Sequence, residues 1–543
     1  MVAVQERHPA QAGREVRLGS RPSGGRGPGP ARNVTPSYPT PSGARGTAVC
    51  QRLEEAIPVA FEDEVADLCQ ACADLASGVT MATARKAIVG VDRKVPLYDG
   101  RQITYVNFDN AATTPPFESV LTVSQMFLQW YGSVHRGSGL KAQISTHAFE
   151  RCREVVADFI GADLLWQTVI FTQNATHALN KVAMHLAPPP DHVVLTTVME
   201  HHSNMLPWRK LGCHVDYARI TREDGRLDLA DLEAKVRRHA GKLAVVSVTG
   251  ASNVTGILPP IRRIARIAHE AGAQIVVDAT QLIPHRGFKM GAPDDPERID
   301  FIAFSGHKMY APFGAGVLAG PKAAFEDRAP DDVGGGTVHA VTMDDVMWAP
   351  LPEKEEAGTP NVLGCLAIGC VVKVLESIGM DNLAEHEREL TRRALAKLSR
   401  VEGLTLYGLK DPDLTEDRLG VITMNARDLC HGHLAAALGH EWGIGVRNGC
   451  FCAQPYVREL LGITDAEMHS IVARLTAGDH ATVPGMVRFS FGVYNTPDEV
   501  DYAVEALQAI LAHGPRANYI LDPQHMEYVP ETPIVRVQEL LPI

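Results

Sequence analysis

Between residues 100 and 360, short β-branched runs alternate with amphipathic stretches, and this rhythm constrains the fold more than any other feature of the chain. Amphipathic helices are expected at 220–240 and 259–272, between short apolar runs. Strands that alternate with helices favour a mostly parallel sheet covered by helices on both faces, an α/β fold. The predicted buried strands are TVIFTQ (168–173), HVVLTTV (192–198), LAVVSVTG (243–250), QIVVDATQ (274–281) and FIAFSGHK (301–308).

The rhythm changes after Gly358, where long helices (about 362–400 and 498–513) and shorter strands indicate a second, smaller α+β domain. The residues before position 49 are rich in Gly, Pro, Ser and Arg and cannot bury enough apolar surface to offset their ordering entropy. Their Arg-rich, acid-poor character also leaves a transit peptide or a wrongly assigned start codon open. The expected organisation is a disordered leader (1–48), an N-terminal helical segment (49–100), a large domain (101–360), a small domain (361–513) and an extended tail (514–543).

Charge and cysteine content narrow the classes of function. The 52 basic and 64 acidic residues leave a net charge of -12, which disfavours nucleic acid or an anionic membrane as the main partner. No run of about 18 apolar residues predicts a transmembrane helix, and no apolar N-terminal segment predicts export. Ten cysteines are then expected to stay reduced in a cytoplasm. Cys69 and Cys72 form a C-x-x-C without a second pair at zinc-finger spacing, so no metal site is expected.

Polar side chains follow the predicted strands in a consistent order. In an open α/β sheet, ligands bind at the carboxyl ends of the strands. Each of these residues alone is more often a cap, a turn residue or a solvated side chain, but the ordered series is hard to produce by chance. The series is Ala175 and Thr176, then His201, Asn253, Asp278 and Gln281, and finally Ser305, His307 and Lys308.

The series fits the chemistry that holds pyridoxal 5'-phosphate. The N–H groups of the helix that begins near Ala175, with the Thr176 hydroxyl, suit a phosphate, to which Ser305 and His307 would also donate. These four residues would form the phosphate side of the site.

The remaining residues suit the cofactor ring. Asp278 can pair with the pyridine nitrogen and keep it protonated, and Gln281 can hydrogen-bond the phenolic oxygen. Lys308 would form the Schiff base, for which desolvation must lower its pKa. The imidazole of His201 can lie flat on an aromatic ring.

Nine motifs resemble the class V (fold-type I) aminotransferase superfamily, and within it the cysteine desulfurases of the selenocysteine-lyase-like branch. They run in the family's order through the chain. The motifs are NFDNAATTPP (107–116), VHRGSGLKAQIST (134–146), MEHHSNMLPW (199–208), SNVTGILPPI (252–261), VDATQ (277–281), FSGHKMYAPFGAGVL (304–318), EAGTPN (356–361), VRNGCFCAQP (446–455) and VRFSFGVYNTPDEVD (487–501).

The resemblance implies a large domain with a seven-stranded, mostly parallel sheet between helices, plus a smaller α+β domain. It implies that His201 stacks on the cofactor and that Asn253 supports the substrate side. Thr359 would reach the phosphate of the neighbouring subunit of a homodimer. Arg488 would bind the substrate α-carboxylate, for which a guanidinium is suited because it pairs in a bidentate way.

By the same resemblance, Cys452 falls on the cysteine that forms a persulfide, so L-cysteine would yield L-alanine and sulfur for an acceptor protein. A thiolate is the nucleophile, and Arg447, expected beside the substrate, can supply the positive charge that favours it. Cys450 makes a C-x-C pair that can resolve the persulfide, bind a metal or do nothing. The segment from Cys452 to Arg488 is about twenty residues longer than expected, and loops of that length are often lids or partner sites.

Two alternatives stay open. The scaffold also suits a selenocysteine lyase, a C–S lyase acting on a larger thioether, or an epimerase; the last two need no persulfide, so dependence on Cys452 separates them. A non-catalytic sulfur carrier would have no physical need for Lys308, Asp278, Gln281 and His201 together.

Overall fold

The computed structural model describes residues 74, 78–476, 483–522, 527–532 and 535. The predicted leader (1–48) and the Cys69–Cys72 pair lie outside the described residues. The described part of the expected N-terminal helical segment differs from the prediction between residues 78 and 100. It holds the single-turn 3-10 helix η1 (Ala84–Ala87) and the short strand β1 (Lys94–Pro96), which pairs with β2 (Gln102–Thr104).

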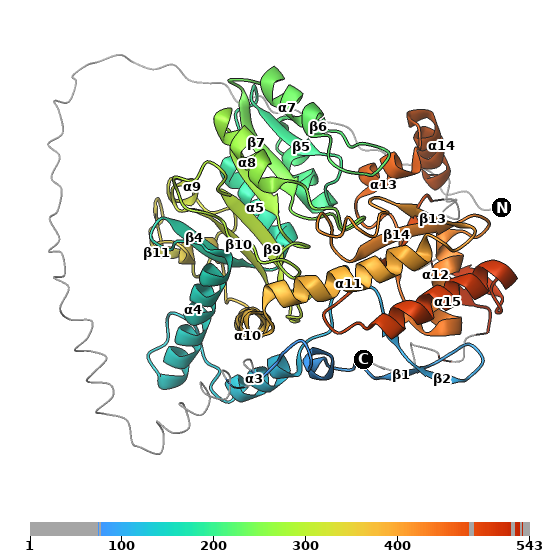
Figure 1. The fold of residues 1–543 in the computed structure, drawn as a ribbon. Coiled ribbons are helices and arrows are strands. Elements are labelled where there is room, and N and C mark those ends of the chain that lie inside the picture. Colours follow the sequence, from blue (N-terminus) through green and yellow to red (C-terminus); the bar gives the residue numbers. More distant parts are fainter. Residues whose placement is uncertain (1–73, 75–77, 477–482, 523–526, 533–534, 536–543) are drawn as a thin grey trace, which may run out of the picture. The chain divides into compact units, whose positions relative to one another are not determined.

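A seven-stranded sheet in the order β4-β10-β9-β8-β7-β5-β6 carries the large domain (Figure 1). β10 runs antiparallel to both of its neighbours, and the other pairings are parallel. The predicted mostly parallel sheet and its five predicted strands are confirmed, while β6 and β10 were not predicted. The strands are β4 (Gln167–Thr172), β5 (Val193–Thr197), β6 (His214–Ala218), β7 (Leu243–Thr249), β8 (Gln274–Asp278), β9 (Phe301–Ser305) and β10 (Gly316–Pro321).

Successive residues of the strands face two different cores, as the pleat requires. Val276 belongs to the core beneath α5, and its neighbour Val277 belongs to the core on the opposite face. Helices therefore cover both faces of the sheet. The first face carries α5 (Ala175–Leu186), α6 (Leu206–Lys210) and α9 (Ala323–Glu326), and the second carries α3 (Glu118–Leu128), α4 (Leu140–Ile160), α7 (Leu229–Arg238), α8 (Ile261–Glu270) and α10 (Val362–Ile378).

The chain after α10 builds a second sheet. It is antiparallel and four-stranded, in the order β13-β14-β17-β16, and shares a separate apolar core with three helices. The strands are β13 (Leu404–Tyr407), β14 (Val421–Ala426), β16 (Arg447–Gly449) and β17 (Met486–Ser490), and the helices are α11 (Met380–Leu398), α12 (His431–Trp442) and α15 (Pro497–His513).

Three predictions for the C-terminal half are wrong in detail. The helix expected over 362–400 is two helices, because Gly379 between α10 and α11 takes a left-handed φ of 84°. The long segment after Cys452 contains α13 (Gln454–Leu461) and α14 (Asp465–Thr476). The tail forms a hairpin of β18 (Tyr519–Asp522) and β19 (Glu527–Pro530), in which the Tyr519 hydroxyl donates to Glu441 of α12 at 3.1 Å.

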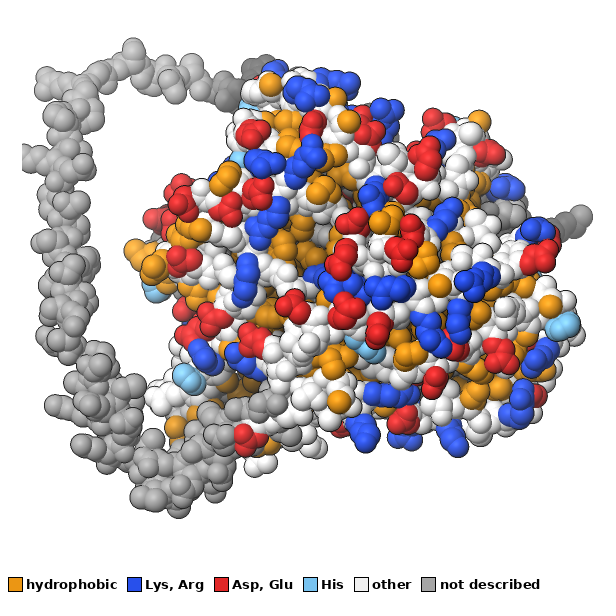
Figure 2. Space-filling view, in the orientation of Figure 1, with side chains coloured by type: hydrophobic (Ala, Val, Ile, Leu, Met, Phe, Trp, Pro, Cys, Tyr) orange, Lys and Arg blue, Asp and Glu red, His pale blue; other side chains and the backbone are white. Residues whose placement is uncertain are grey.

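Smaller elements complete the described structure. They are β3 (Val106–Asn107) paired with β15 (Ile444–Gly445), the hairpin β11 (Val338–Val341) with β12 (Val346–Trp348), and the 3-10 turns η2 (His202–Asn204), η3 (Gly306–Lys308) and η4 (Glu353–Glu355). Acidic and basic side chains are interspersed over the face drawn in Figure 2. Within the described residues no single helix has the length and apolar content to cross a membrane; only α10 and α11 taken together pass that test, across a bend of 76°.

Candidate active site

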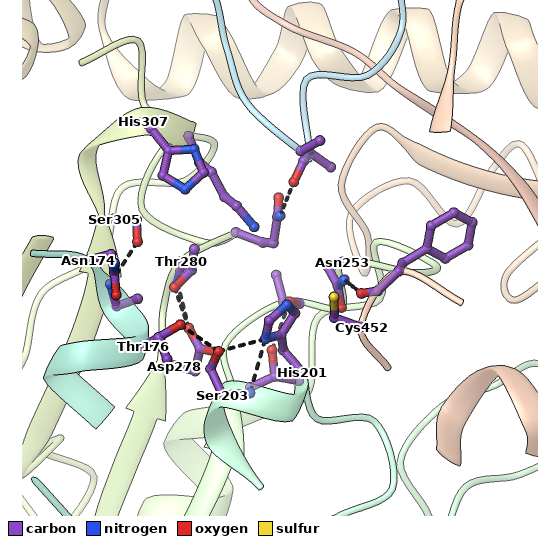
Figure 3. A pocket seen from close by; sticks show the side chains of 18 of the residues that line it. Asn174, Thr176, His201, Ser203, Asn253, Asp278, Thr280, Ser305, His307 and Cys452 are labelled. Atoms are coloured by element: carbon purple, nitrogen blue, oxygen red, sulfur yellow. Dashed lines mark hydrogen bonds between the residues drawn. The ribbon is translucent and has the colours of Figure 1, made fainter. Parts of the chain in front are cut away.

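A cavity of about 330 Å³ opens at the carboxyl ends of the parallel strands (Figure 3). Twelve residues predicted from the sequence line it, and Thr359 and Cys450 do not. The twelve are Ala175, Thr176, His201, Asn253, Asp278, Gln281, Ser305, His307, Lys308, Arg447, Cys452 and Arg488. The strand-end series and the family resemblance together therefore identified residues that are up to 313 positions apart in the chain and line one cavity.

One end of the cavity is formed by the N-terminus of α5 and the end of β9. The Ala175 amide donates to the Ser305 hydroxyl at 2.8 Å, and Asn174 caps the helix by accepting from the His177 amide. Gly316 of β10 lies opposite Ser305, and a Cβ at this glycine would stand 2.6 Å from the Asn174 Cα. A glycine is required there because it lets the helix start approach the sheet. The N–H groups of a helix start beside a hydroxyl suit an anion.

A carboxylate and a neutral imidazole form the floor of the cavity. Asp278 is only 5% exposed and accepts from the Thr280 amide at 3.1 Å. Burial lowers the pKa of His201 to about 4, against the opposing charge of Asp278. The ring is therefore neutral at neutral pH, with Nδ1 accepting from the Ser203 amide at 3.1 Å. Gln281 donates to the Ala111 carbonyl at 2.8 Å.

Lys308 lies just beyond β9. Burial lowers its pKa to about 8, and the nearby charge of Arg488 acts in the same direction. Asp278 opposes this shift. A lysine with such a pKa is neutral in a substantial fraction of molecules near pH 8, and a neutral amine can act as a nucleophile or a base.

The opposite side of the cavity holds a buried arginine. Arg488 is 2% exposed and donates to Asp109 and to the Asn253 carbonyl, both at 2.9 Å. Its Nε is buried without a hydrogen-bond partner in the described structure. Its guanidinium lies 4.9 Å from the centre of the Phe451 ring. An unpartnered donor of a buried cation beside a cavity suits an anionic ligand such as a carboxylate.

Cys452 stands on a turn with unusual backbone geometry. Phe451 and Cys452 have φ angles of 53° and 55°, the left-handed region that non-glycine residues seldom adopt. Such strain persists only where the surroundings hold it. Asn253 donates to the Phe451 carbonyl at 2.7 Å, and the His202 amide donates to the Cys452 carbonyl at 2.8 Å. Cys452 is exposed to the cavity (Figure 3).

Cys450, the other thiol of the C-x-C pair, is half-buried outside the cavity, and burial raises its pKa. Neither thiol belongs to the two groups of potential metal ligands in the described residues, which are His177, Asp331 and Asp332, and His185, Asp331 and Glu355. The described residues therefore offer no set of three ligands for a metal ion at the C-x-C pair. Arg447 is exposed and pairs with Arg488 in the register of β16 and β17.

Thr359 lies in a separate pocket of about 280 Å³. His135, Arg136 and three glycines also line this pocket, and Arg136 donates to the carbonyls of Gly336 and Val338 at 3.1 and 3.2 Å. Thr359 therefore does not share the cavity that the other predicted cofactor residues line.

Sequence reasoning missed several residues of the site. Ser203 and Thr280 line the cavity, and Asp109 holds Arg488. All three belong to the family motifs, and Ser203 and Thr280 stand one or two residues from positions that were singled out, whereas no residue of the motif that holds Asp109 was singled out. Glu200 was also missed. It is fully buried, its pKa is raised by burial to about 8, and it bonds Thr197 and Asn204 at 2.6 Å.

Comparison with known proteins places this site in a family. The model of the aminotransferase class-V family matches residues 106–503. A probable cysteine desulfurase of Streptomyces coelicolor is 36% identical over 438 residues, which is 78% of this chain and 96% of that protein. A cysteine desulfurase of Haloferax volcanii is 34% identical, over 78% of this chain and 93% of that protein.

Solved structures agree. The apo cysteine desulfurase of Thermococcus onnurineus superposes with a TM-score of 0.66 at 31% identity, covering 75% of this chain and 95% of that one. The cysteine desulfurase CsdA of Escherichia coli gives 0.65 at 29% identity, covering 80% and 99%. The chain belongs to the aminotransferase class-V family, in its cysteine desulfurase branch.

Proposed function

We propose that this protein is a pyridoxal-5'-phosphate-dependent cysteine desulfurase, which converts L-cysteine to L-alanine and keeps the sulfur as a persulfide on Cys452. The observation that carries the proposal is that Cys452, Lys308 and Arg488 line one cavity. A thiol, an amine of lowered pKa and a buried cation are then available to a single amino-acid substrate.

The residues of the cavity fit the cofactor. Lys308 would hold it covalently, and Asp278 would keep its ring nitrogen protonated. The helix start at Ala175 and the Ser305 hydroxyl would bind the phosphate, and His201 would stack on the ring. The helix-start donors therefore match the phosphate, the Asp278 carboxylate matches the ring nitrogen, and the Lys308 amine matches the point of covalent attachment. The cavity volume is in the range of small-molecule sites, roughly 300–1,000 Å³.

Bound pyridoxal phosphate supplies an electron sink that acidifies the substrate Cα–H. Arg488 binds the substrate carboxylate with its unpartnered Nε. Lys308 takes the Cα proton on Nζ and returns a proton during turnover, for which a pKa near the working pH is favourable. Asp278 would pair with the ring nitrogen and the neutral imidazole of His201 would stack on the ring.

Cys452 performs the sulfur step. Its thiolate attacks the substrate sulfur, so that an S–S bond forms as the substrate Cβ–S bond breaks. The electron pair of the broken bond stays on the three-carbon fragment, which takes up protons and leaves as alanine. No oxidant is needed, because the substrate carbon is reduced as the two sulfurs become a persulfide. An acceptor protein would then remove the outer sulfur, in the cytoplasm, where thiols stay reduced.

The test of the function uses L-cysteine with the purified enzyme and with two cysteine variants. Alanine and dithiothreitol-releasable sulfide are measured. Wild type is expected to form both, Cys452→Ala to lose both by about 10²-fold or more, and Cys450→Ala to keep most of the activity, since Cys450 lies outside the cavity. Release of pyruvate, or racemisation of the substrate, by the wild type would contradict the proposal.

We also propose a homodimer in which Thr359 binds the cofactor phosphate of the partner subunit. The separate Thr359 pocket supports it, because this residue does not line its own chain's cavity. Light scattering is expected to give twice the chain mass, and Thr359→Val to weaken cofactor binding by about tenfold, as for one lost hydrogen bond to a charged group. A monomeric, fully active wild type would rule the dimer out.

A further inference from the structure

His202 makes two contacts with the turn that carries Cys452. Its backbone amide donates to the Cys452 carbonyl at 2.8 Å. Its ring Nε2 accepts from the Gln454 amide at 3.3 Å. The two contacts fall on either side of Ala453, so a single residue, His202, is hydrogen-bonded both to the turn and to the start of α13.

The contacts of His202 hold the backbone of the turn and leave the Cys452 thiol available to the cavity. Both contacts end on main-chain groups, and Cys452 itself lines the cavity. The turn needs such support because Phe451 and Cys452 occupy the left-handed region, which non-glycine residues adopt only where their surroundings hold them. Asn253 supplies a third contact, to the Phe451 carbonyl.

His202 is also joined to the cofactor side of the cavity. It follows His201, and the segment that holds both begins at Glu200, which accepts hydrogen bonds from the Thr197 hydroxyl and the Asn204 side-chain amide at 2.6 Å. The peptide unit between His201 and His202, together with the two hydrogen bonds of His202, thereby links the histidine proposed to stack on the cofactor to the turn that carries the thiol.

We propose that His202 is a positioning residue for the nucleophile. Its neutral ring accepts a hydrogen bond from the Gln454 amide and so holds the turn that carries Cys452 where the thiol can reach the substrate sulfur. This inference rests on the proposed desulfurase function. Only a ring with an unprotonated Nε2 can accept this bond. Burial, with the charge of Arg209, lowers the pKa of His202 and favours that form.

Substitution of His202 by glutamine and by asparagine distinguishes a role as hydrogen-bond acceptor from a role in packing alone. The side-chain oxygen of glutamine reaches about as far as Nε2 of histidine, whereas asparagine reaches only as far as Nδ1. His202→Gln is expected to keep the turnover rate of alanine formation within about twofold. His202→Asn and His202→Leu are expected to lose about tenfold in turnover with little change in KM, the effect of one hydrogen bond and a slightly misplaced thiol.

Two further measurements show where the loss arises. Exchange of the Cα hydrogen of L-alanine in D₂O depends on Lys308 and does not need Cys452, so it is expected to be unchanged in all three variants. Amide hydrogen exchange at Gln454, on the loaded enzyme, is expected to be faster in His202→Asn and His202→Leu than in wild type and His202→Gln. His469→Gln, on the exposed face of α14, serves as the control.

The outcomes decide the inference separately from the function. If His202→Asn formed alanine at the wild-type rate, or if His202→Gln were as impaired as His202→Asn, the ring acceptor would not be what holds the nucleophile. A parallel loss of Cα exchange would show a general collapse of the site and overturn the inference too. Failure of the wild type to form alanine would instead reject the desulfurase function, while the exchange at Gln454 would still test whether His202 holds the Gln454 amide.

Discussion

Replacing Lys308 with alanine is expected to lower alanine formation by about 10²–10⁴-fold or more, because the variant loses both the covalent attachment of the cofactor and the base that moves the Cα proton. The structure offers no substitute nearby, since the other cavity-lining cations of the described chain, Arg447 and Arg488, carry guanidinium groups and not primary amines. The measurement is alanine release together with the intact mass after borohydride treatment. Wild type is expected to gain the reduced cofactor as a covalent adduct, and Lys308→Ala is expected not to.

Lys308→Arg is the matched control, because it keeps the positive charge but cannot form the covalent link. It is expected to be as inactive as the alanine variant. An arginine variant with substantial activity would mean that Lys308 contributes only charge. A covalent adduct in Lys308→Ala would mean that another lysine is the anchor.

Replacing Glu387 of α11 with alanine is expected to cost about 3–5 kcal/mol of the free energy of unfolding, the usual effect of removing one partner of a buried ion pair. Glu387 is 4% exposed and accepts from the Gly420 amide at 2.6 Å. It also pairs with His285 at 3.1 Å and with Arg286. The variant would leave these buried donors without their acceptor. Denaturant unfolding measures the loss, and Glu385→Ala, on the exposed side of the same helix, is expected to cost less than about 1 kcal/mol.

The same carboxylate predicts a pH dependence. Burial alone would raise its pKa, but His285, Arg286 and the Gly420 amide together lower it to about 2. A carboxyl group whose pKa is lowered by folding stabilises the protein fully above its unfolded pKa of 4.5, and this stabilisation is lost as the pH falls from 4.5 toward 2. In Glu387→Gln that part of the acid-induced loss should vanish. An unchanged acid profile would show that the charge of Glu387 does not contribute.

Most of the central sheet could be predicted because its strands are continuous apolar runs, as buried parallel strands must be. β6 was missed because it lies at an edge and is mostly half-exposed, and β10 because its sequence, GVLAGP, carries two glycines and a proline. The break between α10 and α11 rests on one glycine inside an otherwise helical pattern, which periodicity alone does not detect.

The residues of the proposed cofactor side could be predicted to lie together because each stands at the end of a strand, where position in the sequence implies position in space. The residues of the nucleophile side were named from the family resemblance, but the geometry of the turn that carries Cys452 was not predictable. The left-handed turn at Phe451 and Cys452 depends on Asn253, 198 residues earlier, and on His202. Such contacts are set by the packing of distant segments, and no local pattern in GCFCAQP indicates them.

The position of β10 has a consequence for how the protein is made. β4 and β9 do not pair with each other, because β10 lies between them. In the finished sheet the start of α5 and Ser305 are held together across β10, so we expect this contact to form once residues 316–321 have joined the sheet, and Arg488 is synthesised later still. Ribosomes deliver the N-terminal part first, so a growing chain carries α5 long before it can retain the cofactor. We therefore expect the proposed cofactor to be loaded late in biosynthesis, and chains released before β10 is complete to remain without it.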